Sequence, residues 1–269
     1  MEGMIRRIKV NALLLVVLLV CTVVIVSFRE RNITPNHLSL KYELPQLQSS
    51  QPEKVVEHLG YTVSFNTNWF IPNWVAYELT AEEVQGVEPR GNNFMPDPDI
   101  WESPSTDDYK NSGYDRGHMA PAADMKWSKQ AMTESFYTSN ICPQNHNLNG
   151  GDWKDLEEHV RSMATKYDHI YIACGPVVPF KPQTIGQYSF SKRIAIPDAF
   201  FKVILRQKGD TWSAIGFIMP NQAGHKALKN YVMSVEDVEM IADIDFFVAL
   251  PDSIEDKIES TYNLRDWDL

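Results

Sequence analysis

Residues Tyr114 to Glu157 read YDRGHMAPAADMKWSKQAMTESFYTSNICPQNHNLNGGDWKDLE. This stretch places a histidine, His118, directly after a glycine and follows it with two asparagines, Asn140 and Asn149. An imidazole can transfer protons near neutral pH. An uncharged oxygen ligand with a carboxylate nearby suits a hard divalent cation that keeps most of its waters. The pattern therefore indicates a base and a metal ion at one site.

Two arginines accompany this histidine. Arg116 belongs to the same stretch, and Arg90 precedes it on a segment rich in Pro, Asn and Asp. The paired N–H donors of a guanidinium match the oxygens of a phosphate. A base, a metal ion and phosphate-binding cations are the components needed to hydrolyse a phosphodiester. Each arginine could also be an ordinary solvated residue, and Arg116 could instead pair with a nearby carboxylate.

Further motifs extend along most of the chain. They are Trp74–Tyr77, Arg90, Phe94, Asp97, Asp115–His118, Ser139–Asn140, Pro143–Gln144, Leu148–Asn149, Leu156–Glu157, Cys174–Pro176, Phe217–Asn221 and Phe246–Phe247. In this order and spacing they resemble the DNA/RNA non-specific endonuclease family, an endonuclease G-like family with a ββα-metal (His-Me finger) active site. The resemblance covers roughly residues 56 to 260, and no position that carries chemistry departs from the family pattern.

The resemblance implies the fold and the metal chemistry. It implies an α+β fold with a mixed, mainly antiparallel sheet, flanking helices and the ββα-metal motif. It also implies that His118 is the general base and that Asn149 binds Mg²⁺, with Mn²⁺ as a substitute. Glu157 is expected to hold metal-bound waters.

The resemblance also implies how the substrate is held. Asn140 is expected to position the metal-bound cluster or the phosphate as part of the catalytic set. Arg90 and Arg116 are expected to bind the substrate and to stabilise the charge of the transition state. DNA and RNA are the implied substrates, with little preference for base.

Each of these residues also has a purely structural interpretation. His118 could be a core histidine, and Asn149 could cap the helix that we expect to begin there. Glu157 could be a surface glutamate, and Asn140 could be a buried residue that satisfies loop backbone. His146 lies between the two asparagines, but an exposed loop histidine is the simpler interpretation of it.

Aromatic and β-branched runs predict a series of strands, and apolar residues at helical spacing predict several helices. The predicted strands are 61–65, 74–79, 169–173, 201–205 and 212–219, and the predicted helices are 129–137, a helix opening at 149, 235–242 and 254–261. Residues 83–108 lack periodicity and predict a long loop, a kind of segment that often has a functional role. Cys142 and Cys174 fit buried free thiols, with a disulfide as the alternative.

Charge restricts how nucleic acid could be bound. The chain has 269 residues and a formal net charge of −10; the first 31 residues carry +3, so the remainder carries −13. Proteins that bind duplexes tightly through phosphates are usually basic. Any contact with nucleic acid must therefore come from a local cationic patch, with strong salt dependence. The acidic run from Val235 onward predicts a solvated face.

The N-terminal region predicts membrane attachment. Residues 10–28 are almost entirely apolar and long enough to span a bilayer of ~30 Å, so we expect a transmembrane signal anchor. Residues 1–9 would be a short cytoplasmic tail, 29–55 a polar linker, and 56–269 the endonuclease domain. The bias of basic residues favours a catalytic domain outside the cytoplasm, in the periplasm or at the cell surface of a bacterium.

The function predicted from these observations is metal-dependent, non-specific cleavage of DNA and RNA. Two alternatives stay open at this point. The same site could act on a small or lipid-linked phosphodiester, which the acidic balance would suit, or the domain could be a non-catalytic binding module. The sequence also leaves open a homodimer.

Overall fold

The computed structural model describes residues 40–186 and 193–269. The predicted cytoplasmic tail, 1–9, and the predicted transmembrane anchor, 10–28, both lie outside these residues. Among the helices that the structure describes, none is long and apolar enough to cross a membrane. The membrane anchor therefore stays a prediction.

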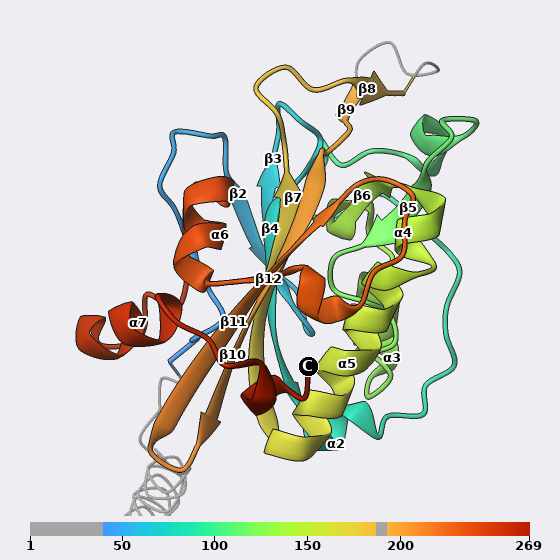
Figure 1. Ribbon diagram of the computed structural model, residues 1–269. Helices are drawn as coiled ribbons and strands as arrows, with labels where there is room; N and C mark the ends of the chain where they lie inside the picture. The colour runs from blue at the N-terminus through green and yellow to red at the C-terminus, as the bar shows by residue number, and fades with distance from the viewer. Residues whose placement is uncertain (1–39, 187–192) are drawn as a thin grey trace, which may run out of the picture. The chain divides into compact units, whose positions relative to one another are not determined.

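A seven-stranded sheet forms the centre of the folded unit (Figure 1). Its order is β12-β11-β10-β7-β4-β3-β2, and every neighbouring pair is antiparallel. This arrangement confirms the predicted antiparallel sheet, and each of the five predicted strands is present. The strands are β2 (Lys54–Glu57), β3 (Thr62–Asn66), β4 (Ile71–Thr80), β7 (His169–Val177), β10 (Ala199–Lys208), β11 (Thr211–Pro220) and β12 (Val232–Met233).

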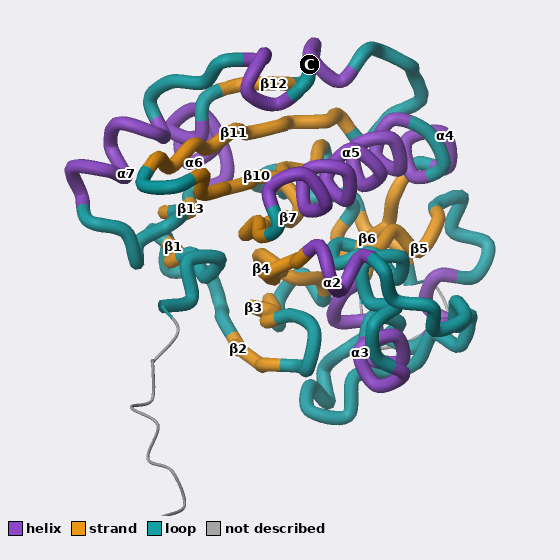
Figure 2. Tube along the Cα trace, turned by 90° about the horizontal axis from the view of Figure 1, so that it is seen from below, coloured by secondary structure: helices purple, strands orange, loops and turns teal. Residues whose placement is uncertain are grey.

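Both faces of the sheet are covered, so its central strands are buried on both sides. On β10, Phe200 and Ile204 belong to one apolar cluster, while Phe201, Val203 and Leu205 belong to the other. Successive side chains of a strand point to opposite faces. The first face packs against α5 (Asp152–Tyr167), and the second packs against α6 (Val235–Ala242) and α7 (Asp252–Glu259) (Figure 2).

Between β4 and α5 the chain forms short elements beside the first face. They are α2 (Ala81–Val84), η1 (Thr106–Tyr109), β5 (Asp115–His118), α3 (Lys129–Glu134), η2 (Thr138–Asn140), β6 (Ile141–Gln144) and α4 (His146–Asn149). Elsewhere lie β1 (Gln46–Leu47), β8 (Thr184–Ile185), β9 (Ile194–Ala195), η3 (Leu228–Asn230), β13 (Ile244–Asp245) and η4 (Leu264–Trp267). The loop predicted over 83–108 is irregular except for its two ends.

The folded unit begins earlier than the linker prediction placed it. Residues 29–55 were expected to be a polar tether, but Gln46–Leu47 pairs with β13. The ring of Tyr42 also packs against Tyr171 and Trp212, and the compact unit starts at Lys41. These contacts form with residues far along the chain, so the local composition of the segment did not reveal them.

The helix expected to open at Asn149 is instead two helices. Asn149 ends the one-turn α4, and α5 begins at Asp152. Gly151 separates them because its backbone (φ −118°, ψ −113°) is not helical. A Cβ at Gly151 would lie 2.5 Å from a backbone oxygen, so the close turn requires glycine. Asn149 is therefore not the N-cap of the long helix.

Two further predictions can be compared with the structure. Cys142 and Cys174 are buried free thiols and form no disulfide. The acidic C-terminal region is only in part a solvated face. Glu259 at the end of α7 is 6% exposed, and burial together with the nearby Glu239 and Glu255 raises its pKa to about 9.

We predict that Glu259→Gln stabilises the fold in a pH-dependent way. The pKa of a glutamate in an unfolded chain is ~4.3, so the folded state binds the proton of Glu259 more tightly than the unfolded state does. Ionisation of Glu259 therefore lowers the free energy of unfolding as pH rises from about 4.5 to 9. The variant should melt a few degrees above the wild type at pH 8.5 and close to it at pH 5. Thermal melts at both pH values would show this difference. Glu236→Gln, on an exposed position of α6, is the control, and equal shifts for Glu259→Gln at both pH values would contradict the prediction.

Candidate active site

A cleft of about 760 Å³ opens beside α5. Strand β5 contributes Asp115, Arg116 and His118 to its lining. This strand pairs with β6 in antiparallel register from Asp115↔Gln144 to His118↔Ile141. With α4 and α5 these strands make the expected ββα arrangement. The cleft is lined by Arg90, Phe94, Thr106, Tyr109, Lys110, Tyr114, Asp115, Arg116, His118, Pro121, Ala122, Ala123, Asn149, Lys154, Glu157, Glu158 and Arg161.

His118 lies at the end of β5 in an aromatic enclosure. Its ring is perpendicular to that of Phe136, with centroids 5.0 Å apart, and 5.3 Å from the ring of Phe94. Burial, and then the charges of Arg90 and Arg116, lower the pKa of His118 to about 3. Its Nε2 atom is buried and has no hydrogen-bond partner in the described part of the chain. A neutral imidazole with an unused nitrogen is the form that can accept a proton.

The backbone around His118 is held by donors from two directions. Trp153 on α5 donates its indole N–H to the carbonyl of His118, at 3.3 Å. The thiol of Cys174 on β7 donates to the carbonyl of Met119, at 3.2 Å. The end of β5 is therefore attached to both the long helix and the central sheet, which restricts the position of the imidazole.

Asn140 has the contacts that its structural interpretation expected. It is fully buried and does not line the cleft. Its Oδ1 accepts from the amide of Ala120, and its Nδ2 donates to the carbonyls of Ala120 and Ser135. The amide group thus holds the segment that follows His118. A role of Asn140 in positioning the metal-bound cluster or the phosphate stays a prediction.

The two predicted arginines do reach the cleft together. The guanidinium of Arg116 lies 4.3 Å from the ring centroid of Phe94, and that of Arg90 lies 5.5 Å from the ring of Phe136. Among the described residues, neither forms an ion pair with a carboxylate. Stacking on an aromatic face orients a guanidinium and leaves its N–H donors available for an anion.

Asn149 is oriented by an acidic neighbour. Its Nδ2 donates to Oδ2 of Asp115, at 2.9 Å, which leaves the carbonyl Oδ1 available to a cation. His146 also contacts this Asp115 oxygen through Nδ1, at 3.0 Å, but its side chain is 82% exposed and does not line the cleft. The structure thus agrees with the interpretation of His146 as an exposed histidine and brings Asn149 to the site.

Glu157 supplies the carboxylate that accompanies Asn149 in the cleft. Burial raises its pKa to about 8, despite the opposing charge of Lys202. A cation beside a carboxylate favours the ionised form, so a divalent ion would offset this burial. An amide oxygen with one nearby carboxylate suits Mg²⁺, which keeps several of its waters. The residues of the cleft therefore fit a hard metal ion.

The sequence of the chain is similar to those of known nucleases. The family described as DNA/RNA non-specific endonuclease matches residues 41–253. The chain belongs to this family. It is 36% identical over 218 residues to the protein named "Nuclease EXOG, mitochondrial" of Danio rerio, which covers 74% of this chain and 63% of that protein. The chain thus spans less than two thirds of that relative's length.

Other members of the family give the same assignment. The "Nuclease C1" of Cunninghamella echinulata var. echinulata is 35% identical over 209 residues, covering 71% of this chain and 82% of that protein. A solved structure, "Crystal structure of the EndoG/EndoGI complex: Mechanism of EndoG inhibition", superposes with a TM-score of 0.72 and 30% identity. It covers 83% of this chain and 96% of that one. The α+β fold with a mainly antiparallel sheet and the family, both expected from the sequence, are confirmed.

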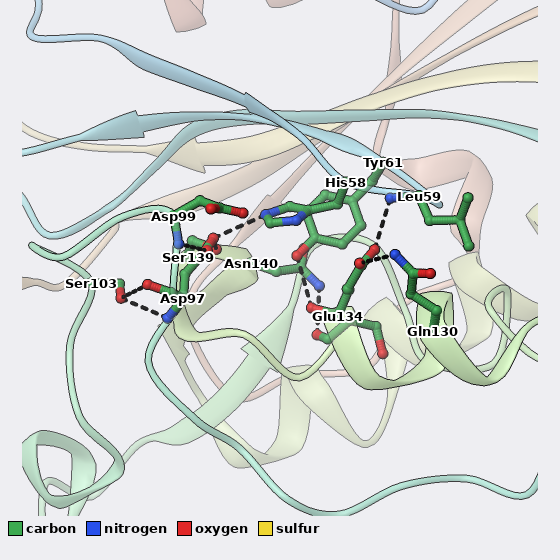
Figure 3. A network of polar contacts seen from close by, with 11 residues as sticks. His58, Leu59, Tyr61, Asp97, Asp99, Ser103, Gln130, Glu134, Ser139 and Asn140 are labelled. Atoms are coloured by element: carbon green, nitrogen blue, oxygen red, sulfur yellow. Dashed lines mark hydrogen bonds and ion pairs between the residues drawn. The ribbon is translucent and has the colours of Figure 1, made fainter.

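One buried network supports the site without lining it (Figure 3). The carboxylate of Asp97 is 2.9 Å from Nε2 of His58 and accepts a hydrogen bond from Ser139, at 2.5 Å. Burial alone would raise the pKa of Asp97, but these hydrogen bonds lower it. The backbone amide of Asp97 in turn donates to Ser103. Asp97 thereby attaches the loop that carries Arg90 to the rest of the fold.

Sequence reasoning did not identify the partners in this network. Asp97 belonged to the family motif but had no assigned role, and His58 showed no usable pattern. Lys202 was also missed: it is fully buried on β10, with its Nζ 4.8 Å from the ring centroid of Trp153 and no hydrogen-bond partner among the residues described. A lysine in the middle of the apolar run of β10 was the only clue.

Within residues 40–186 and 193–269, two clusters of side chains that could bind a metal ion lie outside the cleft. One is His58, Asp97 and Asp99, and the other is Asp152, Asp155 and His225. Asp97 is satisfied by the donors just described. Asp152 accepts from Tyr231, from His225 and from the amide of Lys226. Both acids are therefore accounted for by hydrogen bonds within the protein.

We predict that Asp97→Asn impairs catalysis through misplacement of the Arg90 loop. The substitution keeps the side chain's size but removes the charge that accepts from His58 and Ser139. Because Phe94 on this loop packs against His118, kcat should fall about tenfold or more, measured well below the melting temperature of the variant. Glu134→Gln is the matched control. Glu134 accepts a hydrogen bond from the amide of Leu59, the residue after His58 in the turn between β2 and β3. If both variants keep full kcat while losing stability, Asp97 has only a structural role.

Proposed function

We propose that this protein is a metal-dependent nuclease that hydrolyses phosphodiester bonds in DNA and RNA without strong base preference. One observation carries the proposal. A single cleft collects a neutral histidine, two arginines without carboxylate partners, and an asparagine–glutamate pair from segments far apart in the sequence. Membership of a nuclease family supports the same conclusion.

His118 would act as the general base. Its low pKa keeps the imidazole neutral over the physiological range, and its free Nε2 can accept a proton from water as the water attacks phosphorus. The enclosure by Phe94 and Phe136 limits rotation of the ring. The contacts to the carbonyls of His118 and Met119 restrict the position of its backbone.

Asn149 would hold the metal ion through Oδ1, with Glu157 binding its waters. When bound, Mg²⁺ would neutralise the charge that develops on the phosphate and on the leaving oxygen. Arg90 and Arg116 would hold the non-bridging phosphate oxygens with paired hydrogen bonds. Their position on aromatic rings presents these donors with little loss of side-chain entropy.

The cleft has a cationic lining, although the chain as a whole is acidic. Five cations and three carboxylates line the cleft, although the protein as a whole carries −10. Binding of a polyanion would therefore depend on a few cations that act against a repulsive field, and it would weaken steeply with salt.

We predict that His118→Ala and Asn149→Ala both lose activity, but with different responses to metal. Removal of a general base typically costs ~10²–10⁴-fold, and added Mg²⁺ should not restore His118→Ala. Asn149→Ala should regain part of its rate at high Mg²⁺ or Mn²⁺, because its defect lies in metal affinity. Plasmid and total RNA digestion, with and without chelator, would measure this.

His146→Ala is the matched control, since His146 is an exposed histidine at the same corner of the fold. It should keep near-normal activity. Full activity of the wild type in excess chelator would contradict the proposed mechanism.

We further propose that residues 10–28 anchor the protein in a membrane with the catalytic domain outside the cytoplasm. The support is the apolar composition of this segment and the basic residues that precede it. In a bacterium the domain would lie in the periplasm or at the cell surface. Homodimer formation stays a prediction.

We predict that protease added to spheroplasts with intact inner membranes will degrade the folded domain. A cytoplasmic protein of known protease sensitivity is the internal control. Protection of the domain until the membrane is lysed, followed by rapid degradation, would show that the orientation is the reverse.

A further inference from the structure

The cleft continues into a second groove along α5. This side groove has a volume of about 310 Å³ and is lined by Val84, Ala123, Lys126, Arg161, Ser162 and Thr165. Ala123 and Arg161 line both the cleft and the side groove. The two depressions therefore border each other at these two residues.

The lining of the side groove is suited to an anion. It contains two cations and two hydroxyl groups, and no carboxylate. Lys126 is half-buried and, in the described residues, forms no ion pair. Ser162 and Thr165 are exposed on α5. Phosphate oxygens in protein–nucleic acid complexes are bound by lysine, arginine and hydroxyl side chains of this kind.

The walls of the side groove are held in place. Arg161 donates to Asp124, at 2.8 Å, and the buried Asp124 also accepts from Tyr77. This contact takes one of the five N–H donors of the guanidinium and fixes its orientation. The backbone of Lys126 is held because its carbonyl accepts from Glu88, at 2.8 Å. A Cβ at Gly86 would lie 2.3 Å from the Lys126–Trp127 peptide, so the neighbouring loop fits closely against it.

Helix geometry gives the length of the path. Glu157, Arg161 and Thr165 are spaced by four residues and form one stripe on α5. The eight residues from Glu157 to Thr165 span about 12 Å at ~1.5 Å per residue. At ~3.4 Å per nucleotide along a strand, this distance corresponds to about three to four nucleotides.

We propose that the side groove binds the phosphate backbone of a polynucleotide, about three to four nucleotides from the bond that is cleaved. The proposal rests on the proposed nuclease function and deepens it, because it makes a polymer the preferred substrate over a small phosphodiester. Lys126 and the hydroxyls of Ser162 and Thr165 would contact phosphates and would not read bases. DNA and RNA strands would both be accepted, since the groups recognised are common to the two.

The test compares short and long substrates. Single-stranded DNA and RNA oligonucleotides of 3 and 12 nucleotides would be cleaved by the wild type, Lys126→Ala, Thr165→Lys and Lys129→Ala. Lys129 is an exposed lysine on α3 that lines neither depression, so its variant is the matched control. The measured quantity is kcat/KM as a function of salt concentration.

Lys126→Ala should lower kcat/KM several-fold for the 12-mer and leave the 3-mer unchanged. The slope of log kcat/KM against log salt for the 12-mer should become shallower by about 0.7. Thr165→Lys should change both quantities in the opposite direction, and Lys129→Ala should change neither. Equal effects of Lys126→Ala on both lengths, or no effect of either groove variant on the 12-mer, would overturn the proposal. Wild-type protein that cleaves neither length would instead count against the nuclease function itself.

Discussion

The indole of Trp153 connects the parts on which the active site depends. Its ring is buried between α5 and the sheet, 5.6 Å from the ring of Phe200, while its N–H donates to the carbonyl of His118. Apolar packing presses α5 onto the sheet. This packing therefore helps to set the position of His118 relative to the helix that carries Glu157. Burial of a helix face is non-directional, so the directional hydrogen bonds from Trp153 and Cys174 are needed to fix the backbone at His118 and Met119.

Charges buried beneath the cleft are balanced as a group. Asp124 and Lys202 are fully buried, and Arg161 is mostly so. Asp124 and Arg161 form a direct pair, whereas Lys202 lies over the ring of Trp153 and opposes the effect of burial on Glu157. An unpaired buried charge is costly, so removal of any one member would leave another uncompensated. This balance keeps cations close to the cleft in a protein that is acidic overall.

The loop that carries Arg90 shows why some of the site could not be predicted. Its sequence has no periodicity, so its path depends on Asp97, which accepts hydrogen bonds from His58 and Ser139. Each of these partners is about 40 residues away along the chain. Asn140 is a second case. Its motif predicted a catalytic residue. In the structure its amide group forms hydrogen bonds with the backbone of Ala120 and Ser135, and it does not line the cleft.

The sequence by itself determined the antiparallel sheet, the family and the position of His118 in the family motif. Strand and helix periodicity is a local property, and the motif residues are recognisable by type and spacing alone. Tertiary structure decided the roles that depend on direction and distance. Asn140 is buried outside the cleft. Helix α4 ends at Asn149, whose side chain is oriented by Asp115, and the charge of Lys202 acts on Glu157. Tertiary structure also drew residues 41–55 into the fold and joined a cationic side groove to the cleft. These outcomes arise from contacts between segments that are distant in the sequence, and the energy of such contacts cannot be predicted from any local stretch of residues.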